Sequence, residues 1–302
     1  MAALKLRHVQ VHELGPYLAG LRQLEAAISY PLDDGREQFR IDHGPGYADF
    51  FSGLGEAHFA IACDGDQVVG ALAGVLRLSR RGSRELASVY LADLKVAAEY
   101  RGKGLGRDLL LFAVGRLREA RFRRWRLAFG AAMRGARGDV MNSARGFHPA
   151  RLGAALARLH VYFVPPQQLA RLPGDATLRL PPGECLDLSP QAQVTAPAGF
   201  VSTAGRKDLR LLSTGEPWPL WHLPHSPAVA GSSWLGYLAQ CGTALSSQPG
   251  LCCFALDERL LAHVQALAAQ GITPGSICTV YGLALHPAGW RIPWLHLSTA
   301  EI

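Results

Sequence analysis

The order of apolar and polar positions along the first 165 residues predicts strands that alternate with helices. Runs with a period of two indicate strands, whereas apolar residues spaced three and four apart indicate helices. A short strand opens the chain, and helical patterns follow as far as Tyr30. The later predicted elements are a hairpin over 58–79 that turns at Asp64-Gly65-Asp66, strands over 89–96 and 125–129, helices over 105–119 and 149–159, and a closing strand over 160–164. This order predicts a mixed α+β domain.

Prolines mark the end of that domain. Seven of the chain's 19 prolines lie between residues 165 and 197, and such clusters oppose regular packing. We therefore expect a domain over 1–165, a proline-rich connector over 166–197 and a second, smaller α+β domain over 198–302. The elements expected in the second domain are strands at LRLLS and PLWHL, a helix over 233–245, a strand over 252–256, a helix over 258–270 and a final hairpin that turns at His286-Pro287-Ala288-Gly289.

The junction between the strand over 89–96 and the helix over 105–119 has the composition of an anion site. Residues 101–107 read Arg-Gly-Lys-Gly-Leu-Gly-Arg. Glycines let the backbone approach a phosphate closely, and the first N–H groups of a helix point towards it. The spacing does not fit a P-loop, which needs four residues between its glycines and then Gly-Lys-Ser/Thr. It does not fit the Gly-x-Gly-x-x-Gly loop of dinucleotide-binding domains either.

The spacing does fit Arg-x-x-Gly-x-Gly, as Arg101, Gly104 and Gly106, after a strand that ends in Leu-x-Val. With these residues, the stretch LADLKVAAEYRGKGLGRDLL over 91–110 resembles the central motif of the GNAT superfamily of N-acetyltransferases. Ala98 departs from it, because the family often has a proline near that position. The predicted element order extends the resemblance to about residues 1–165. A faint echo of residues 89–101 at 280–291 suggests that the second domain is a degenerate repeat of the same fold.

The resemblance implies acetyl-CoA as the cofactor and assigns residues to its binding. The main chain of Leu94, Lys95 and Val96 would pair with the pantetheine arm. The pyrophosphate would lie on a cradle formed by Arg101, Gly102, Lys103, Gly104, Leu105, Gly106 and Arg107. Asp93, on the same strand, is the candidate general base, and a carboxylate that only pairs with an arginine is an equally good interpretation of it. The tyrosine that protonates the leaving thiolate in this family falls on Leu156, so the general acid is unassigned.

The expected function is N-acetyl transfer to an amine of a small molecule or peptide, by direct attack in a ternary complex. No cysteine stands in the motif to carry an acyl intermediate. The absence of a tyrosine at Leu156 favours an alternative, a catalytically silent acyl-CoA-binding regulatory module. The second domain would cover the acceptor side or pair two copies of the chain in a homodimer.

The segment over 29–51 is the candidate wall of the acceptor pocket. It mixes aromatic residues with acids, a combination that suits a cationic amine, but ordinary helix packing with polar outer faces fits the segment better. The aromatic residues are Tyr30, Phe39, Tyr47, Phe50 and Phe51, and the acids are Asp33, Asp34, Asp42 and Asp49.

Charge is concentrated beside the glycine loop. Residues 101–126 hold nine basic and two acidic residues, which equals the net charge of +7 for the whole chain. A basic patch attracts an anionic ligand such as CoA. The run RFRRWR at 121–126 also fits a helix end exposed to solvent or, less well, a nucleic-acid surface.

Composition bears on the location of the protein, the state of its cysteines and metal binding. The chain has no apolar run long enough to span a bilayer and no signal-like N-terminus, so a cytoplasmic protein without membrane contact is expected. Its six cysteines form no CxxC pair and are expected to be reduced thiols. His222 and His225 are separated by a proline and have no nearby carboxylate pair, so no metal site is expected.

Overall fold

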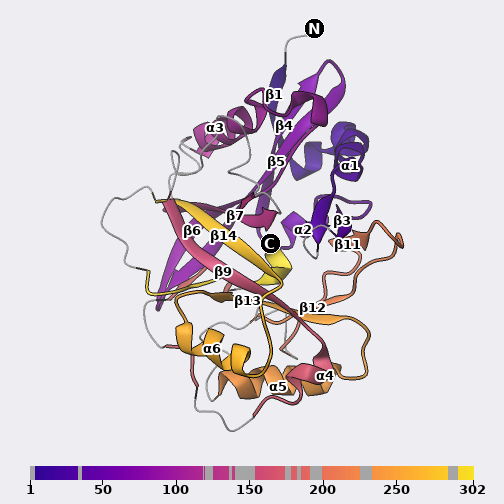
Figure 1. Ribbon diagram of the computed structural model, residues 1–302. Coiled ribbons are helices and arrows are strands. Elements are labelled where there is room, and N and C mark those ends of the chain that lie inside the picture. The colour runs from indigo at the N-terminus through magenta and orange to yellow at the C-terminus, as the bar shows by residue number, and fades with distance from the viewer. Residues whose placement is uncertain are drawn as a thin grey trace.

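The computed structural model describes residues 4–32, 36–117, 119, 125–135, 138–139, 154–173, 178–181, 185–190, 199–224, 233–284 and 292–302. Within these residues, one large mixed sheet organises the molecule (Figure 1). The main path of the sheet runs through β1 (Lys5–Gln10), β4 (Glu56–Asp64), β5 (Gln67–Arg81), β6 (Arg84–Val96), β7 (Leu127–Gly135), β14 (Ser276–Ala284), β9 (Ala154–Val164), β13 (Leu251–Asp257) and β12 (Leu220–His222).

Short strands extend this sheet and form a second one. β10 (Leu186–Asp187) pairs with β5 and with β15 (Leu295–His296), and β8 (Gly138–Asp139) pairs with β7. The separate sheet contains β2 (Tyr30–Leu32), β3 (Glu37–Asp42) and β11 (Asp208–Leu211). Because β11 comes from the second half of the chain, this small sheet joins the two halves.

Helices cover both faces of the N-terminal part of the large sheet. Consecutive strand residues point to opposite faces, and Val68 and Val69 of β5 accordingly belong to different apolar clusters. Val68 shares a cluster with α1 (Leu18–Ala26), whereas Val69 shares one with α3 (Leu105–Leu117). The short α2 (Asp49–Ser52) contributes Phe50 and Phe51 to the cluster that contains α1 residues.

The C-terminal half has its own helices. In Figure 1, α4 (Pro166–Leu169), α5 (Trp234–Leu245) and α6 (Leu261–Ala269) gather beneath β13 and β12, at the end of the molecule away from α3. Their apolar side chains form a separate cluster centred on Trp234 and Phe254. Most elements predicted for this half are therefore confirmed, including the helix over 233–245 and the strand over 252–256.

Two predicted elements are wrong. The helix predicted over 149–159 is replaced by β9, which begins at Ala154; residues 149–153 lie outside the described residues. Alanine and leucine favour helices, but Ala157, Leu159 and Val161 are buried with a period of two between β14 and β13, and that pairing outweighs local propensity. The final hairpin is also wrong, because β14 pairs with β7 and β9, whereas β15 pairs with β10.

The position of β14 links the two halves of the chain. It lies between β7 and β9 and pairs antiparallel with both, so a strand from residues 276–284 completes the sheet of the first 165 residues. The division at residues 165 and 198 stays a prediction about folding units, while the sheet itself is continuous across it.

Candidate active site

The strands β6 and β7 pair only briefly and then separate. Their parallel ladder joins Ser88–Tyr90 to Leu127–Phe129, and β6 continues to Val96 with pairs only to β5. At the point of separation, a Cβ added to Gly130 would lie 3.0 Å from the carbonyl oxygen of Leu91. The edge of β6 over 91–96 that faces β7 therefore has no strand partner among the described residues. Backbone groups on such an edge are open to a ligand with amide groups.

The separation coincides with a β-bulge. The register between β5 and β6 shifts between Ala71 and Ala73, and Asp93, the extra residue on β6, has a φ of 57°. Positive φ is uncommon for residues other than glycine, although aspartate tolerates it better than most. The bulge turns the carboxylate of Asp93 into the face of the sheet that carries α1 and α2.

The glycine loop follows directly after β6 and forms a cradle at the start of α3. Gly102 and Gly104 have φ values of 74° and 89°, which L-residues with a side chain rarely adopt. Arg101 donates from Nε to the carbonyl oxygen of Val96 at 3.0 Å and so ties the loop to the strand. The side chains of Arg101, Lys103 and Arg107 are exposed beside the first turn of α3, where N–H groups are free to bind an anion.

Gly106 differs from the other loop glycines. A Cβ at this position would meet Leu94 and Val96 only at ordinary contact distances of 3.7 and 3.8 Å, and its φ lies outside the left-handed region. The protein's own packing therefore does not require glycine there. A requirement for glycine at this position would come from a ligand that approaches the helix start.

A buried polar cluster lies behind the bulge. Tyr47 donates from its hydroxyl to Oδ2 of Asp93 at 2.6 Å, and the Lys95 ammonium donates to Oδ1 of the same carboxylate. Lys95 also binds Oε1 of Glu25 at 3.1 Å. Glu25 in turn is 2.6 Å from Nδ1 of His43. The side chains of Lys95 and Asp93 are 1% and 6% exposed, so these interactions are made away from solvent.

The charged groups of the cluster stabilise one another's ionised forms. Burial acts to raise the pKa of Asp93, but the electrostatic attraction of Lys95 and His43 and the hydrogen bonds from Lys95 and Tyr47 outweigh it and lower that pKa to about 2. Burial likewise acts to lower the pKa of Lys95, but Asp93, Tyr30 and Glu25 outweigh it and the pKa is raised. Burial and the adjacent Asp93 raise the pKa of Tyr47. At neutral pH the cluster therefore contains ionised Asp93, charged Lys95 and a protonated tyrosine.

Three members of this cluster have the spacing of metal ligands. The ligand atoms of Glu25, His43 and Asp93 lie within 4.8 Å of one another. The Lys95 ammonium, however, binds both carboxylates directly. A cationic side chain thus supplies the positive charge that a metal ion would supply in such a site.

The aromatic residues predicted for an acceptor pocket belong largely to the core. Tyr47, Phe50 and Phe51 are buried and pack around His43, with ring centroids 4.9–5.4 Å from the imidazole. Asp42 binds Arg210 at 2.7 Å. Asp33 and Asp34 lie outside the described residues.

The predicted site residues divide into two groups in space. Leu94 and Val96 lie next to the cradle, and Asp93 and Lys95 direct their side chains into the buried cluster. Leu156 lies on β9 rather than on a helix, so the reasoning that placed it in the family's tyrosine position does not apply. Glu25 and His43 were missed, because nothing in the local sequence signals that Glu25 binds a lysine 70 residues away and a histidine 18 residues away.

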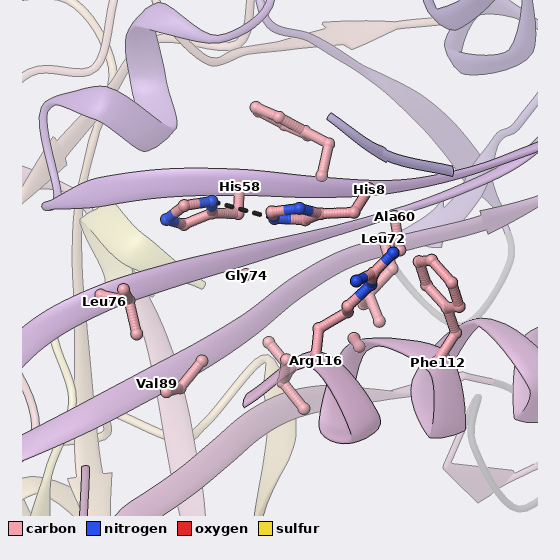
Figure 2. Close-up of a pocket in the computed structure, with 12 residues that line it drawn as sticks. His8, His58, Ala60, Leu72, Gly74, Leu76, Val89, Phe112 and Arg116 are labelled. Carbon is pink, nitrogen blue, oxygen red and sulfur yellow. Dashed lines mark hydrogen bonds between the residues drawn. The ribbon is translucent and has the colours of Figure 1, made fainter. Parts of the chain in front are cut away.

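An apolar hollow lies on the other face of the sheet, under α3 (Figure 2). Leu72, Leu91 and Phe112 are among the residues that line it. At its edge, the rings of His8 and His58 stack at 5.1 Å, with Nε2 of His8 3.1 Å from Nδ1 of His58. Figure 2 shows Arg116 reaching along the same hollow from α3. The hollow is separate from the Asp93 cluster, which lies on the α1 side.

The strand separation, the glycine cradle and the basic loop agree with a comparison to known families. Residues 24–138 match the Acetyltransferase (GNAT) family model. The chain contains a GNAT acetyltransferase domain. The domain is an acyltransferase domain, and its recognition from residues 91–110 is confirmed. No curated protein matches the chain.

Solved structures extend the likeness over both halves of the chain. Yeast N-myristoyltransferase from Saccharomyces cerevisiae, solved with bound myristoyl-CoA, has 11% identity and a TM-score of 0.52; the match covers 97% of this chain and 84% of that one. A GCN5-related N-acetyltransferase from Anabaena variabilis has 12% identity and a TM-score of 0.51, with 93% and 73% covered. At these identities the comparison speaks for the fold alone, a GNAT fold followed by a second GNAT-like domain. No helix in the described part of the chain is long and apolar enough to cross a membrane.

Proposed function

We propose that the GNAT domain transfers an acetyl or other short acyl group from acyl-CoA to an amine of a small molecule or peptide. The observation that carries this proposal is the continuity between the unpaired edge of β6 and the glycine cradle. An extended ligand with amide groups at one end and phosphates at the other would fit both. Acetyl-CoA has that chemistry.

The cradle would hold the pyrophosphate by its backbone. The N–H groups around residues 102–107 face the start of α3, and the positive end of the helix dipole adds attraction for an anion. The main chain of Leu94, Lys95 and Val96 would pair with the pantetheine amides. Lys95 can take part only through its backbone, because its side chain is held by Asp93 and Glu25.

Direct transfer in a ternary complex is supported by the state of the cysteines. All six are buried, and burial raises the pKa of Cys241 to about 11 and those of Cys252 and Cys253 to about 12. A thiol of that pKa is a poor nucleophile near neutral pH. In the proposed step the acceptor nitrogen attacks the thioester carbon, the C–S bond breaks, and the nitrogen loses a proton as the thiolate of CoA leaves.

The general-base role of Asp93 stays a prediction. A carboxylate whose pKa is about 2 takes up a proton weakly at neutral pH, because the best base has a pKa near the working pH. We propose that the main task of Asp93 is to fix the bulge that opens the β6 edge. The general acid, the acceptor, a homodimer and a cytoplasmic location also stay predictions.

A matched pair of glycine variants tests cofactor binding. Gly106→Ala adds a methyl group that the apo protein accommodates, and Gly115→Ala adds one further along α3 where nothing lies within 4 Å. Each change should leave the protein folded, since alanine favours helices by up to about 1 kcal/mol over glycine. Calorimetric titration with acetyl-CoA should show at least tenfold weaker binding, roughly 1.4 kcal/mol, for the first variant only. Equal affinity of both variants for acetyl-CoA would mean that the glycine loop does not bind the pyrophosphate.

Turnover is tested by release of free CoA thiol. Acetyl-CoA is mixed with the protein and with separate amines, including polyamines, amino acids, aminoglycosides and short peptides. An acceptor should raise thiol release well above the acceptor-free rate, and mass spectrometry should find the acetylated amine. Tight binding of acetyl-CoA with no acetylated product across the whole panel would contradict the proposed reaction.

A further inference from the structure

The hollow under α3 runs across the strands of the large sheet. Leu91 on β6, Gly74 on β5 and His58 on β4 are successive register partners, and all three line the hollow. Because neighbouring strands lie about 4.8 Å apart, this row spans roughly 10 Å from β6 to β4. The helix α3 lies over the row and adds Phe112, which is labelled in Figure 2, and Ala113 to the lining.

Glycine at position 74 keeps the floor of the hollow open. Gly74 lies inside β5, a strand with a partner on each side, and it is partly exposed. Among the described residues, a Cβ there would meet Cδ2 of Leu91 at 3.8 Å and the carbonyl oxygen of His58 at 3.9 Å, both ordinary contacts. Its φ lies outside the left-handed region, so neither packing nor backbone conformation requires glycine. Glycine inside a strand often marks a place that a ligand approaches closely.

The surface that the hollow offers to a ligand is apolar. The polar side chains at its rim are engaged with neighbours: Nε2 of His8 lies 3.1 Å from Nδ1 of His58, Nε2 of His58 lies 2.9 Å from Glu56, and Arg116 donates to Glu119 at 2.7 Å. The other residues that line it are apolar or glycine. Such a surface is stabilised when a hydrocarbon group covers it, and it gives a charged amine little to bind.

The hollow begins where the proposed cofactor would end. Leu91, at its β6 end, is the residue whose carbonyl oxygen would lie 3.0 Å from a Cβ at Gly130, at the point where β6 and β7 separate. Leu91, Leu94 and Val96 pack against the apolar cluster of α3, so these side chains of β6 lie on the α3 face. An arm that leaves the cradle at the start of α3 and follows the β6 edge therefore reaches the hollow at Leu91.

We propose that the hollow under α3 binds the acyl chain of the acyl-CoA, and that the GNAT domain prefers an unbranched acyl group of several carbons to acetyl. This inference rests on the acyl-CoA binding proposed above and narrows its acyl group. The thioester would lie at Leu91, and the hydrocarbon chain would cross β5 towards β4 with Gly74 beneath it. A methylene that leaves water contributes about 0.8 kcal/mol, which tightens binding about fourfold.

Chain length provides the test. The full chain is titrated by calorimetry with CoA, acetyl-CoA, hexanoyl-CoA and octanoyl-CoA. We expect hexanoyl-CoA to bind at least about tenfold more tightly than acetyl-CoA, because its added methylenes are buried in the hollow. Equal affinity for acetyl-CoA and the two longer compounds would overturn the inference and leave acyl-CoA binding in place. Absence of binding for all four compounds would overturn both.

Variants that fill the hollow from opposite walls locate the chain. Gly74→Leu adds a side chain from β5, and Ala113→Leu adds one from α3. Gly115→Leu is the matched control, because it adds the same side chain at an exposed position of α3 where nothing lies within 4 Å of the new Cβ. Each filling variant should lose the preference for hexanoyl-CoA over acetyl-CoA by about tenfold or more. The control should keep that preference.

Acetyl-CoA binding, measured on the same samples, shows whether each variant is folded. It should stay within about twofold of the parent in all three, because acetyl ends before the hollow. If one filling variant does not fold, the other decides. An unchanged preference for hexanoyl-CoA in the folded filling variants would overturn the inference, as would a preference lost equally in Gly115→Leu. Equal loss of acetyl-CoA and hexanoyl-CoA binding in both filling variants would overturn it too, because the hollow would then serve the fold alone.

Discussion

The hydroxyl of Tyr47 donates to the carboxylate of Asp93 at 2.6 Å, and these two are the non-glycine residues with positive φ, 45° and 57°, in the part of the chain that the structure describes. Left-handed backbone in a residue with a side chain costs on the order of 1 kcal/mol or more and persists where the surroundings enforce it. Two such residues in direct contact lie at the bulge where β6 leaves β7, so this contact fixes the conformation of the β6 edge that is proposed to bind acyl-CoA.

The first prediction concerns the energy of that contact. Tyr47→Phe removes the donor to a buried carboxylate, so we expect a loss of about 1.5–3 kcal/mol in the free energy of unfolding. Tyr162→Phe is the matched control, because the buried hydroxyl of Tyr162 has no hydrogen-bond partner among the described residues. That change should be neutral or stabilising. Urea unfolding of both variants measures the difference, and equal losses would mean that the Tyr47 hydroxyl stabilises nothing specific.

The second prediction is a loss of stability in acid. The folded-state pKa of Asp93, about 2, lies below its unfolded value of about 3.9, so its contribution is complete above the unfolded value. It is lost as the pH falls from about 4 towards 2, by an amount on the order of 2 kcal/mol. Asn tolerates positive φ, so Asp93→Asn removes the charge while keeping the backbone. Unfolding followed against pH should show a shallower acid limb in this variant; an unchanged limb would assign the acid loss to other groups.

The third prediction concerns the buried ion pair between Arg77 on β5 and Glu301. Arg77 on β5 binds Glu301 through two hydrogen bonds of 2.7 and 3.1 Å, and both side chains are at most 5% exposed. Ser189 adds a third bond to the same carboxylate at 2.6 Å. Arg77→Met or Glu301→Gln should each cost about 3–5 kcal/mol, because each leaves a buried charge unpaired.

The double variant measures the interaction energy between Arg77 and Glu301, apart from the effect of losing either side chain. Combining Arg77→Met with Glu301→Gln removes both charges, so it should be more stable than the sum of the single losses implies. A double-mutant cycle from urea unfolding measures this coupling. Additive losses would show that the two residues act independently despite their contact.

Local sequence was sufficient to predict the glycine loop and its flanking elements, but not the buried polar cluster around Asp93. The loop over 101–107 and its flanking elements follow from spacing and periodicity within about 20 residues, and the structure has them as α3 and β6. Tyr47 and Asp93 are 46 residues apart, and nothing in either neighbourhood indicates that they meet. The bulge that brings Asp93 inward is a register shift, which apolar patterning does not reveal.

Strand pairing between residues far apart in sequence also explains why parts of the predicted fold were wrong. The sequence predicts a helix over 149–159 because alanine, leucine and arginine favour helices, whereas the strand conformation of β9 depends on pairing with β14, more than 100 residues later. The same insertion of β14 joins the halves of the chain, although a run of prolines separates them in sequence. One signal for the site was present in the composition: only four lysines occur, and two of them are buried near Asp93.

The last prediction distinguishes the contribution of charge to acetyl-CoA binding from the steric requirement for glycine in the loop. Lys103 is exposed, and its ammonium lies 5.5 Å from the ring centroid of Tyr100, beside the helix start. Lys103→Gln should weaken acetyl-CoA binding two- to fivefold at low salt, about 0.5–1 kcal/mol for an exposed charge. Arg158→Gln is the control, since this arginine is 48% exposed on β9, away from the cradle. Because the Debye length falls from about 30 Å at 0.01 M to about 3 Å at 1 M salt, the Lys103 effect should fade as salt rises, whereas the Gly106→Ala defect should persist. A Lys103 effect that is independent of salt would point to a direct contact rather than to attraction at a distance.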